Sequence, residues 1–435
     1  MFKTTNFVKR CYGKGLVRNF AVRSSTLNPW TVQGTYTSHK ITHADGCNMY
    51  NGNKKIMDFT SGLMVVNLGH NNPYIKEGFY QHLEMGIAYA NSLFETDQRE
   101  KLSERLVELT NNTGGKVFYT NGGADSNETA VFIAHEYQNQ FNNTHKTKVL
   151  TFARSFHGGS TIGATLLSGD PRKAAKEPHY SLPFESIMQN PSTNDNGDGS
   201  LAQIKTLFEK NDVAAIIIEG SSGSAGCIPY PEGYLKKLER MCREKGILLI
   251  CDEVMSGFGR TGTMFAYEKH GIQPDIITIA KGFTSGYVPF GGVILGKHVG
   301  EIYERKPLVH GLTYFAHPLA CEIANRCIDL YTENDGELFN NVKARGKVMY
   351  TYGDKMEQNL SIVKEYRNNG LLGCVELDTN DDKLLGKISS DLMEKGVYCF
   401  RRLNMLFTAP PLIITNDELC DSMEIINDVL CENSV

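Results

Sequence analysis

Three apolar runs, the third interrupted only by Thr278, constrain the fold of this chain more than any other feature of its sequence. They occupy residues 213–218, 247–251 and 276–280. Such runs are typical of strands buried on both faces of a sheet. An amphipathic helical pattern over 233–245 separates the first two runs. This alternation predicts an α/β fold with a mostly parallel sheet, which binds ligands at the carboxyl ends of its strands.

Length and charge limit the remaining architecture. The chain has 435 residues, and its 45 Lys and Arg against 49 Asp and Glu give a net charge of −4. This length suggests two to three domains at roughly 100–200 residues each. The charge balance does not favour a nucleic-acid partner, and no apolar run approaches the ~20 residues that span a membrane. The eleven cysteines contain no C-x-x-C pair, and the histidines lack metal-binding spacing, so we expect no metal site.

The sequence pattern changes after about residue 325, where longer charged helical segments replace the alternation of apolar strands and helices. We therefore expect a large sheet domain followed by a smaller α+β domain. The predicted division is a leader at 1–25, a segment at 26–60 that packs with the small domain, a large ligand-binding sheet domain at 61–320 and a small domain at 321–435.

The first 44 residues contain basic side chains and no acidic one. An acid-free, basic N-terminus with scattered apolar residues is typical of a transit peptide, and residues 18–21 resemble the sites where mitochondrial presequences are cut. We expect a removable leader and a location in the mitochondrial matrix. The alternative is a basic tail on a cytoplasmic protein.

Residues 121–128 follow a predicted strand with two glycines and then begin a helix. The free N–H groups of a helix N-terminus bind anions, so this turn suits a phosphate. The alternative is an ordinary glycine turn in which Asp125 or Ser126 caps the helix.

Two charged side chains stand at the ends of buried runs. Asp252 follows the run at 247–251, where an acid is costly unless it is paired, and it either caps a turn or faces a cationic ligand. Lys281 follows the run at 276–280, where a lysine either reaches the surface, pairs with an acid or acts as a nucleophilic amine. The segment at 155–159, with an aromatic ring and two glycines, is weaker evidence because ordinary loop packing also explains it.

Together, these four features match the requirements of pyridoxal phosphate. The glycine turn would hold the phosphate, the aromatic ring would stack on the pyridine, and Asp252 would keep the ring nitrogen protonated. Lys281 would form the Schiff base.

The chain resembles the class III (ω-amino-acid) aminotransferases, which are fold-type-I pyridoxal-phosphate enzymes with an aspartate-aminotransferase-like fold. The most specific stretches are 249–262 (LICDEVMSGFGRTG) and 274–289 (PDIITIAKGFTSGYVP), and the likeness covers roughly residues 28–425. Its motifs are closest to the ω-amino-acid:pyruvate transaminases.

The resemblance implies roles for individual residues. Lys281 matches the Schiff-base lysine and Asp252 the partner of the pyridinium nitrogen. Thr313 matches a threonine that reaches the phosphate of the neighbouring subunit, which implies a homodimer with shared sites. Arg401 or Arg402 lies near the mobile arginine that binds a substrate carboxylate. The other matches surround the cofactor: Gly123 and Ala124 at the phosphate, Phe156 and Val254 on the two faces of the ring, and His157 and Glu128 beside it.

Three positions depart from the family's pattern. Met255 replaces a glutamine that contacts the ring hydroxyl in many relatives, and Met64 stands where some relatives have a pocket aromatic. Ser224 takes the position of the glutamate that masks an arginine in ornithine, acetylornithine and GABA enzymes.

We therefore expect ping-pong transfer of an amino group from an ω-amino acid or amine to a 2-oxo acid, with pyruvate the expected acceptor. Alternatives are an aminomutase or decarboxylase on the same fold, such as a glutamate-semialdehyde aminomutase-like enzyme. A 2-oxoglutarate-using 4-aminobutyrate or diaminononanoate aminotransferase also remains open.

Overall fold

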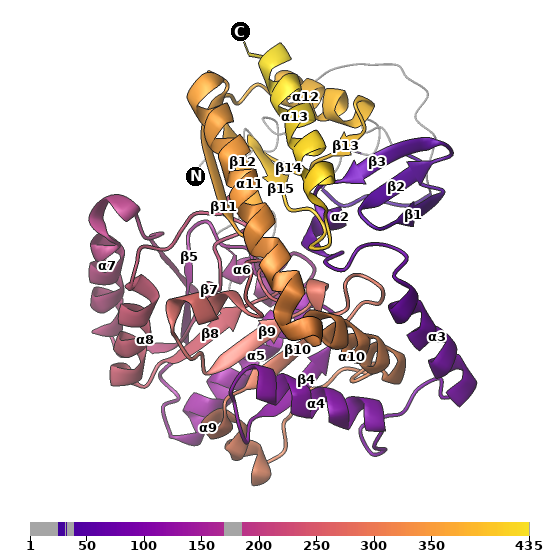
Figure 1. Ribbon diagram of the computed structural model, residues 1–435. Helices are drawn as coiled ribbons and strands as arrows, with labels where there is room; N and C mark the ends of the chain where they lie inside the picture. Colours follow the sequence, from indigo (N-terminus) through magenta and orange to yellow (C-terminus); the bar gives the residue numbers. More distant parts are fainter. Residues whose placement is uncertain (1–24, 31, 33–38, 169–184, 435) are drawn as a thin grey trace.

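The structure is a computed structural model that describes residues 25–30, 32, 39–168 and 185–434. A seven-stranded sheet with its helices fills the lower part of the view in Figure 1, and helices α12 (Asp382–Glu394) and α13 (Asn416–Glu432) lie in the upper part. The α/β fold expected from the sequence is confirmed. Residues 1–24 of the expected leader lie outside the described residues, and the domain boundaries at 60/61 and 320/321 remain predictions.

The seven-stranded sheet contains all three apolar runs. Its strand order is β4 (Lys116–Thr120), β10 (Gly291–Leu295), β9 (Ile276–Ile279), β8 (Leu248–Asp252), β7 (Val213–Glu219), β5 (Lys148–Phe152) and β6 (Glu185–Met188). The pairs from β6 through β9 are parallel, whereas β10 runs antiparallel to both β4 and β9. The expected mostly parallel sheet is therefore present, with one reversed strand.

Helices cover both faces of this sheet. On β7, Ala215 and Ile217 pack in one apolar cluster with side chains of α5 (Gly123–Gln140). Ile216 and Ile218 point the other way, into the cluster that contains side chains of α4 (Asp97–Leu109) and α8 (Tyr234–Lys245). Every residue of β7 is buried, which is why the run contains no polar side chain before its last residue.

The C-terminal part is an α+β arrangement, as expected. Strands β11 (Val363–Asn369), β12 (Leu372–Leu377), β15 (Met405–Thr408) and β14 (Arg401–Arg402) form an antiparallel sheet in that order. Gly370 adopts a φ of 63° in the turn between β11 and β12. The helices of this part are α10 (Pro318–Thr332), α11 (Glu337–Asn359), α12 and α13.

A small sheet joins the two ends of the chain. Strands β1 (His43–Asp45), β2 (Asn48–Asn51) and β3 (Lys54–Asp58) form an antiparallel sheet. β3 also pairs in parallel with β13 (Val397–Tyr398), so the N-terminal segment contacts the C-terminal part.

Arg260 connects three segments in the interior, and its side chain is fully buried. Its Nη2 donates to Asn67 Oδ1 at 2.7 Å and to Ser61 Oγ at 3.2 Å, and its Nη1 donates to the carbonyls of Leu371, at 3.1 Å, and Pro410. The guanidinium therefore ties the N-terminal segment and the C-terminal part to the loop after β8.

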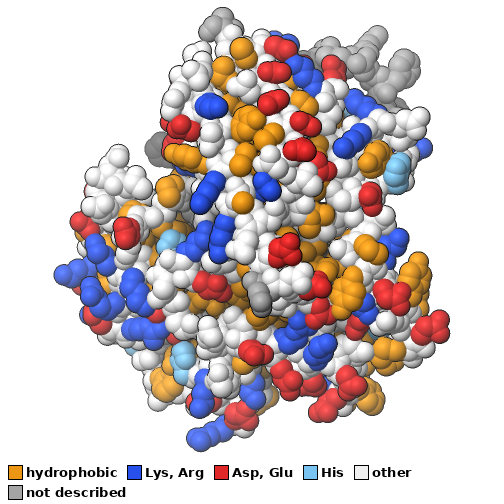
Figure 2. Space-filling model, viewed as in Figure 1, with side chains coloured by type: hydrophobic (Ala, Val, Ile, Leu, Met, Phe, Trp, Pro, Cys, Tyr) orange, Lys and Arg blue, Asp and Glu red, His pale blue; other side chains and the backbone are white. Residues whose placement is uncertain are grey.

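The remaining helices are short or lie at the surface. They are α2 (Ser61–Met64), α3 (Pro73–Met85), α6 (Ile162–Leu167), α7 (Asp198–Phe208) and α9 (Lys297–Gly300), with 3₁₀ turns η2 (Thr193–Asp195), η3 (Ala266–His270), η4 (Lys281–Phe283), η5 (Glu301–Glu304) and η6 (Glu333–Gly336). On the face shown in Figure 2, basic side chains gather at the lower left, over α7 and α8, with acidic ones among them. In the described part of the chain, no helix is both long and apolar enough to cross a bilayer.

Candidate active site

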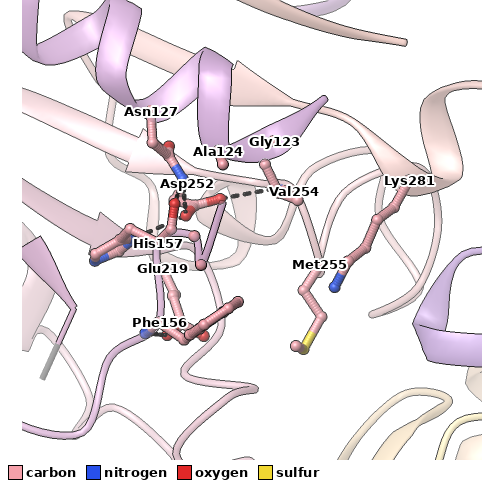
Figure 3. Close-up of a pocket in the computed structure, with 12 residues that line it drawn as sticks. Gly123, Ala124, Asn127, Phe156, His157, Glu219, Asp252, Val254, Met255 and Lys281 are labelled. Carbon is pink, nitrogen blue, oxygen red and sulfur yellow. Dashed lines mark hydrogen bonds and ion pairs between the residues drawn. The ribbon is translucent and has the colours of Figure 1, made fainter. Parts of the chain in front are cut away.

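A cavity of about 210 Å³ lies at the carboxyl ends of β7 and β8, beside the first turn of α5 and the start of η4 (Figure 3). A parallel sheet is expected to bind its ligand at this edge. The cavity is lined by Gly123, Ala124, Asn127, Phe156, His157, Gly158, Gly159, Glu219, Asp252, Val254, Met255 and Lys281.

The glycine turn after β4 forms one end of the cavity. Helix α5 begins at Gly123, and its N-cap residue is Gly122, which has no side chain to bind the first N–H groups. A Cβ at Gly123 would lie 2.6 Å from Val254 Cγ1, so only glycine lets the backbone approach this closely. The N-cap is therefore neither Asp125 nor Ser126, and Ser126 Oγ donates to the carbonyl of Gly122 at 3.0 Å. The turn can therefore offer N–H groups to an anion.

Asp252 is the last residue of β8, and its side chain is buried. Its Oδ2 accepts hydrogen bonds from Asn127 Nδ2 and His157 Nδ1, both at 2.7 Å, and its Oδ1 accepts from the backbone N–H of Val254 at 2.9 Å. These three donors fix the orientation of the carboxylate and satisfy a buried negative charge.

Lys281 follows β9 and opens η4 with a φ of 49°, a left-handed conformation that is uncommon for lysine. Burial lowers the pKa of its ammonium, against the opposing attraction of Asp252 and Glu219. Figure 3 shows its amine directed toward Met255. A lysine with these properties can serve as a nucleophile and as a base.

The aromatic segment lies between β5 and α6. The backbone N–H of Phe156 donates to Glu219 Oε1 at 3.1 Å, and Asn127 Nδ2 donates to the carbonyl of His157 at 2.8 Å. His157 Nε2 lies 3.0 Å from Thr151 Oγ1, so both imidazole nitrogens have partners. These contacts tie the segment to the strand ends on which Glu219 and Asp252 stand.

Seven of the predicted site residues line the cavity: Gly123, Ala124, Phe156, His157, Asp252, Val254 and Lys281. The other five lie outside it: the two arginines on β14, described below, and Glu128, Met64 and Thr313. Glu128 packs against α6, where a Cβ at Gly163 would lie 2.7 Å from its Oε1. Met64 is buried in a neighbouring apolar cluster with Cys227. Thr313 is exposed, and its carbonyl accepts a hydrogen bond from the hydroxyl of Tyr89.

The structure separates the two candidate arginines on β14. Arg402 Nη1 donates to the carbonyl of Ser224, which in turn donates from its backbone N–H to Glu219 Oε2 at 3.0 Å. Arg401 Nη1 instead donates to the carbonyl of Leu403 at 2.7 Å and lies 3.9 Å from Asp382 Oδ1. Arg402 is therefore the one connected to the cavity wall.

Two polar side chains in the cavity lining, those of Glu219 and Asn127, were not among the sequence candidates. Glu219 ends the buried strand β7 as Asp252 ends β8, so the same signal identifies it. Burial raises the pKa of its carboxyl. Asn127 lies one helical turn after Gly123, a spacing that places both on one face of α5.

These residues fit pyridoxal phosphate. A phosphate suits the N-terminus of α5, the buried Asp252 suits a protonated ring nitrogen, and Lys281 carries an amine that no hydrogen bond holds among the described residues. The described residues contain no cluster of His, Cys, Asp and Glu that could hold a metal ion.

Comparisons with known proteins agree with this geometry. The family pattern described as aminotransferase class-III matches residues 31–430. An acetylornithine aminotransferase of Haemophilus ducreyi is 31% identical over 394 residues, which cover 90% of this chain and 94% of that protein. An omega-aminotransferase of Caulobacter vibrioides is 32% identical over 410 residues, which cover 87% and 90%.

A solved structure is also similar. It is the taurine:2-oxoglutarate aminotransferase of Bifidobacterium kashiwanohense in complex with pyridoxal phosphate and glutamate. Its TM-score is 0.86 at 31% identity, and the match covers 93% of this chain and 95% of that one.

Proposed function

Because the chain belongs to the class-III aminotransferases, which use pyridoxal phosphate, we propose that it catalyses transamination by a ping-pong mechanism. We propose pyruvate as the amino acceptor. The amino donor is an ω-amino acid or amine. The observation that carries the choice of acceptor is Ser224, because the loop after β7 contacts Arg402 through the Ser224 carbonyl and not through a carboxylate. The guanidinium can then leave this carbonyl for a substrate carboxylate without separating an ion pair with that loop.

Asp252 and Lys281 have different roles in the proposed reaction. Pyridoxal phosphate, when bound, supplies a protonated ring that withdraws electrons from the carbon bearing the amino group. Asp252 holds the proton on the ring nitrogen as a fixed anion. Lys281 Nζ removes the proton from the amino-bearing carbon, and burial favours its neutral form for this step.

A donor-by-acceptor screen on the purified holoenzyme tests the proposal. We expect amine transfer from ω-amino donors to exceed background with pyruvate, and to be slower with 2-oxoglutarate. Faster transfer to 2-oxoglutarate would contradict the proposed acceptor. Product formation with no acceptor would instead favour an aminomutase. The Lys281→Ala variant should lose both turnover and the visible absorption of the attached cofactor. A Lys281→Ala variant with normal activity would refute the catalytic role of Lys281.

We also propose a homodimer in which Thr313 completes the partner's site. Large apolar side chains are exposed near Thr313, including Val309 at 75% and Tyr314 at 60%. The half-buried ring of Tyr89 lies 6.1 Å from that of Tyr314. Exposed apolar patches of this kind are typical of protein interfaces. Gel filtration with light scattering tests the proposal, and a fully active monomer would contradict it.

For localisation, we propose import into the mitochondrial matrix, supported by the acid-free basic N-terminus. A fusion of residues 1–30 to a fluorescent protein should reach mitochondria. A diffuse cytoplasmic signal would favour the alternative.

A further inference from the structure

Asn127 is a buried polar side chain that the proposed reaction does not use directly. It lies on the first turns of α5, four residues after Gly123 and three after Ala124, and its side chain is 1% exposed. Figure 3 shows it reaching from the helix toward Asp252. One short stretch of helix therefore carries both the phosphate-binding turn and a contact to the anion at the other end of the cavity.

The hydrogen bonds of Asn127 determine which way its amide faces. Its Nδ2 lies 2.7 Å from Asp252 Oδ2 and 2.8 Å from the carbonyl of His157. The carbonyl oxygen can only accept a hydrogen bond, as can the ionised Asp252 carboxylate, so both amide hydrogens must point to them. The amide oxygen then faces Thr278 Oγ1 at 2.6 Å and must accept from that hydroxyl.

Thr278 stands one step further from the cavity. It lies on β9, is fully buried, and is not among the residues that line the cavity. Its hydroxyl stabilises the one orientation of the Asn127 amide in which Nδ2 donates to Asp252. The order of contacts is therefore Thr278 to Asn127 to Asp252.

We propose that Asn127 is a positioning residue for Asp252 and that Thr278 acts through it. By holding Oδ2 from the same helix turn that binds the phosphate, Asn127 fixes where the carboxylate stands relative to the phosphate end of pyridoxal phosphate. The inference rests on that cofactor occupying the cavity and is independent of which donor and acceptor the enzyme uses.

A double-mutant cycle on cofactor affinity tests this order of contacts. The apoenzyme is prepared as wild type, Asn127→Ala, Thr278→Val and the double variant, and the Kd for pyridoxal phosphate is measured by quenching of protein fluorescence. Asn127→Ala removes one of three donors to a buried carboxylate, so we expect Kd to rise about 10- to 100-fold. Thr278→Val keeps the shape of the side chain and should raise Kd about 3- to 10-fold.

The double variant decides between a chain of contacts and independent packing. If Thr278 acts through Asn127, Thr278→Val should add nothing once Asn127 is alanine. Thr278→Ser, which keeps the hydroxyl, should bind nearly as tightly as wild type. Equal effects of Thr278→Val in both backgrounds, or a wild-type Kd for Asn127→Ala, would overturn the proposal.

A matched control separates this effect from loss of a buried amide in general. Asn325 on α10 is 3% exposed, and its Nδ2 donates to the carbonyl of Gln98 at 2.8 Å. Asn325→Ala should lower the unfolding temperature and leave the Kd for pyridoxal phosphate unchanged. If Asn127→Ala does not fold, Thr278→Val against Thr278→Ser decides the question, because equal affinities of these two variants would overturn the proposal.

Discussion

Glu253, the residue after Asp252, provides a quantitative test of the electrostatics beneath the site. Its side chain is fully buried, with Oε2 2.7 Å from Ser256 Oγ and Oε1 accepting from the N–H of Tyr267 at 2.8 Å. Burial raises the pKa of this carboxyl from 4.5 to about 7. The perturbation we choose is Glu253→Gln, which keeps the shape and resembles the protonated acid.

The sign and size of the expected stability change follow from the raised pKa of Glu253. A carboxyl whose pKa is raised in the folded state contributes stability below its unfolded pKa, and this contribution is lost as pH rises through the folded value. The shift from 4.5 to about 7 corresponds to about 3 kcal/mol at 1.36 kcal/mol per pH unit. The glutamine does not titrate, so Glu253→Gln should gain about 3 kcal/mol on wild type between pH 4.5 and pH 8.

Urea unfolding of the apoenzyme at several pH values measures this difference. Glu239→Gln is a control for which the expected stability change has the opposite sign. Burial raises the pKa of the Glu239 carboxyl, but its hydrogen bonds with Lys236, the N–H of Gln273 and Arg243 have the larger effect, so the net pKa is lowered. That contribution is present above the unfolded pKa and is lost as pH falls, so Glu239→Gln should cost stability at neutral pH. A stability difference between Glu253→Gln and wild type that does not grow with pH would refute the reasoning.

Three further predictions concern the cavity and its supports. Gly123→Ala should weaken binding of pyridoxal phosphate about tenfold or more in a fluorescence titration, because its Cβ would lie 2.6 Å from Val254 Cγ1; wild-type affinity would contradict this. Arg402→Ala should raise the KM for a carboxylate-bearing acceptor about tenfold or more and Arg401→Ala should not, so equal effects in steady-state kinetics would disprove the distinction. Arg260→Met should lower the free energy of unfolding by about 3 kcal/mol, since it leaves buried acceptors unpaired; an unchanged urea midpoint would argue against this.

The sequence predicts those parts of the fold that depend on local burial. The runs at 213–218, 247–251 and 276–280 had to be strands covered on both faces, and they became β7, β8 and β9. The reversal of β10 was not predictable in this way, because strand direction depends on the path of the chain before it. The pairing of β3 with β13 was also not predictable from the sequence, because it joins segments from opposite ends of the chain.

The candidate site follows the same division. Asp252 and Lys281 were identifiable because a charge at the end of a buried strand requires an explanation in itself. Asn127 carries no such signal, as an asparagine near the start of a helix usually faces water or caps a turn. Its contacts with Asp252, His157 and Thr278 come from three different segments, and only the folded chain brings them together.

The pairing of β3 with β13 has a consequence for synthesis of the chain. Met57 pairs with Val397, so β3 leaves the ribosome roughly 340 residues before its partner. At about 5–20 residues per second, its free edge waits roughly 20 to 70 s. An exposed strand edge is a template for pairing with other chains, so a chaperone that covers residues 43–58 during this interval would raise the yield of active enzyme. A transcript that ends before codon 397 would leave that edge open permanently.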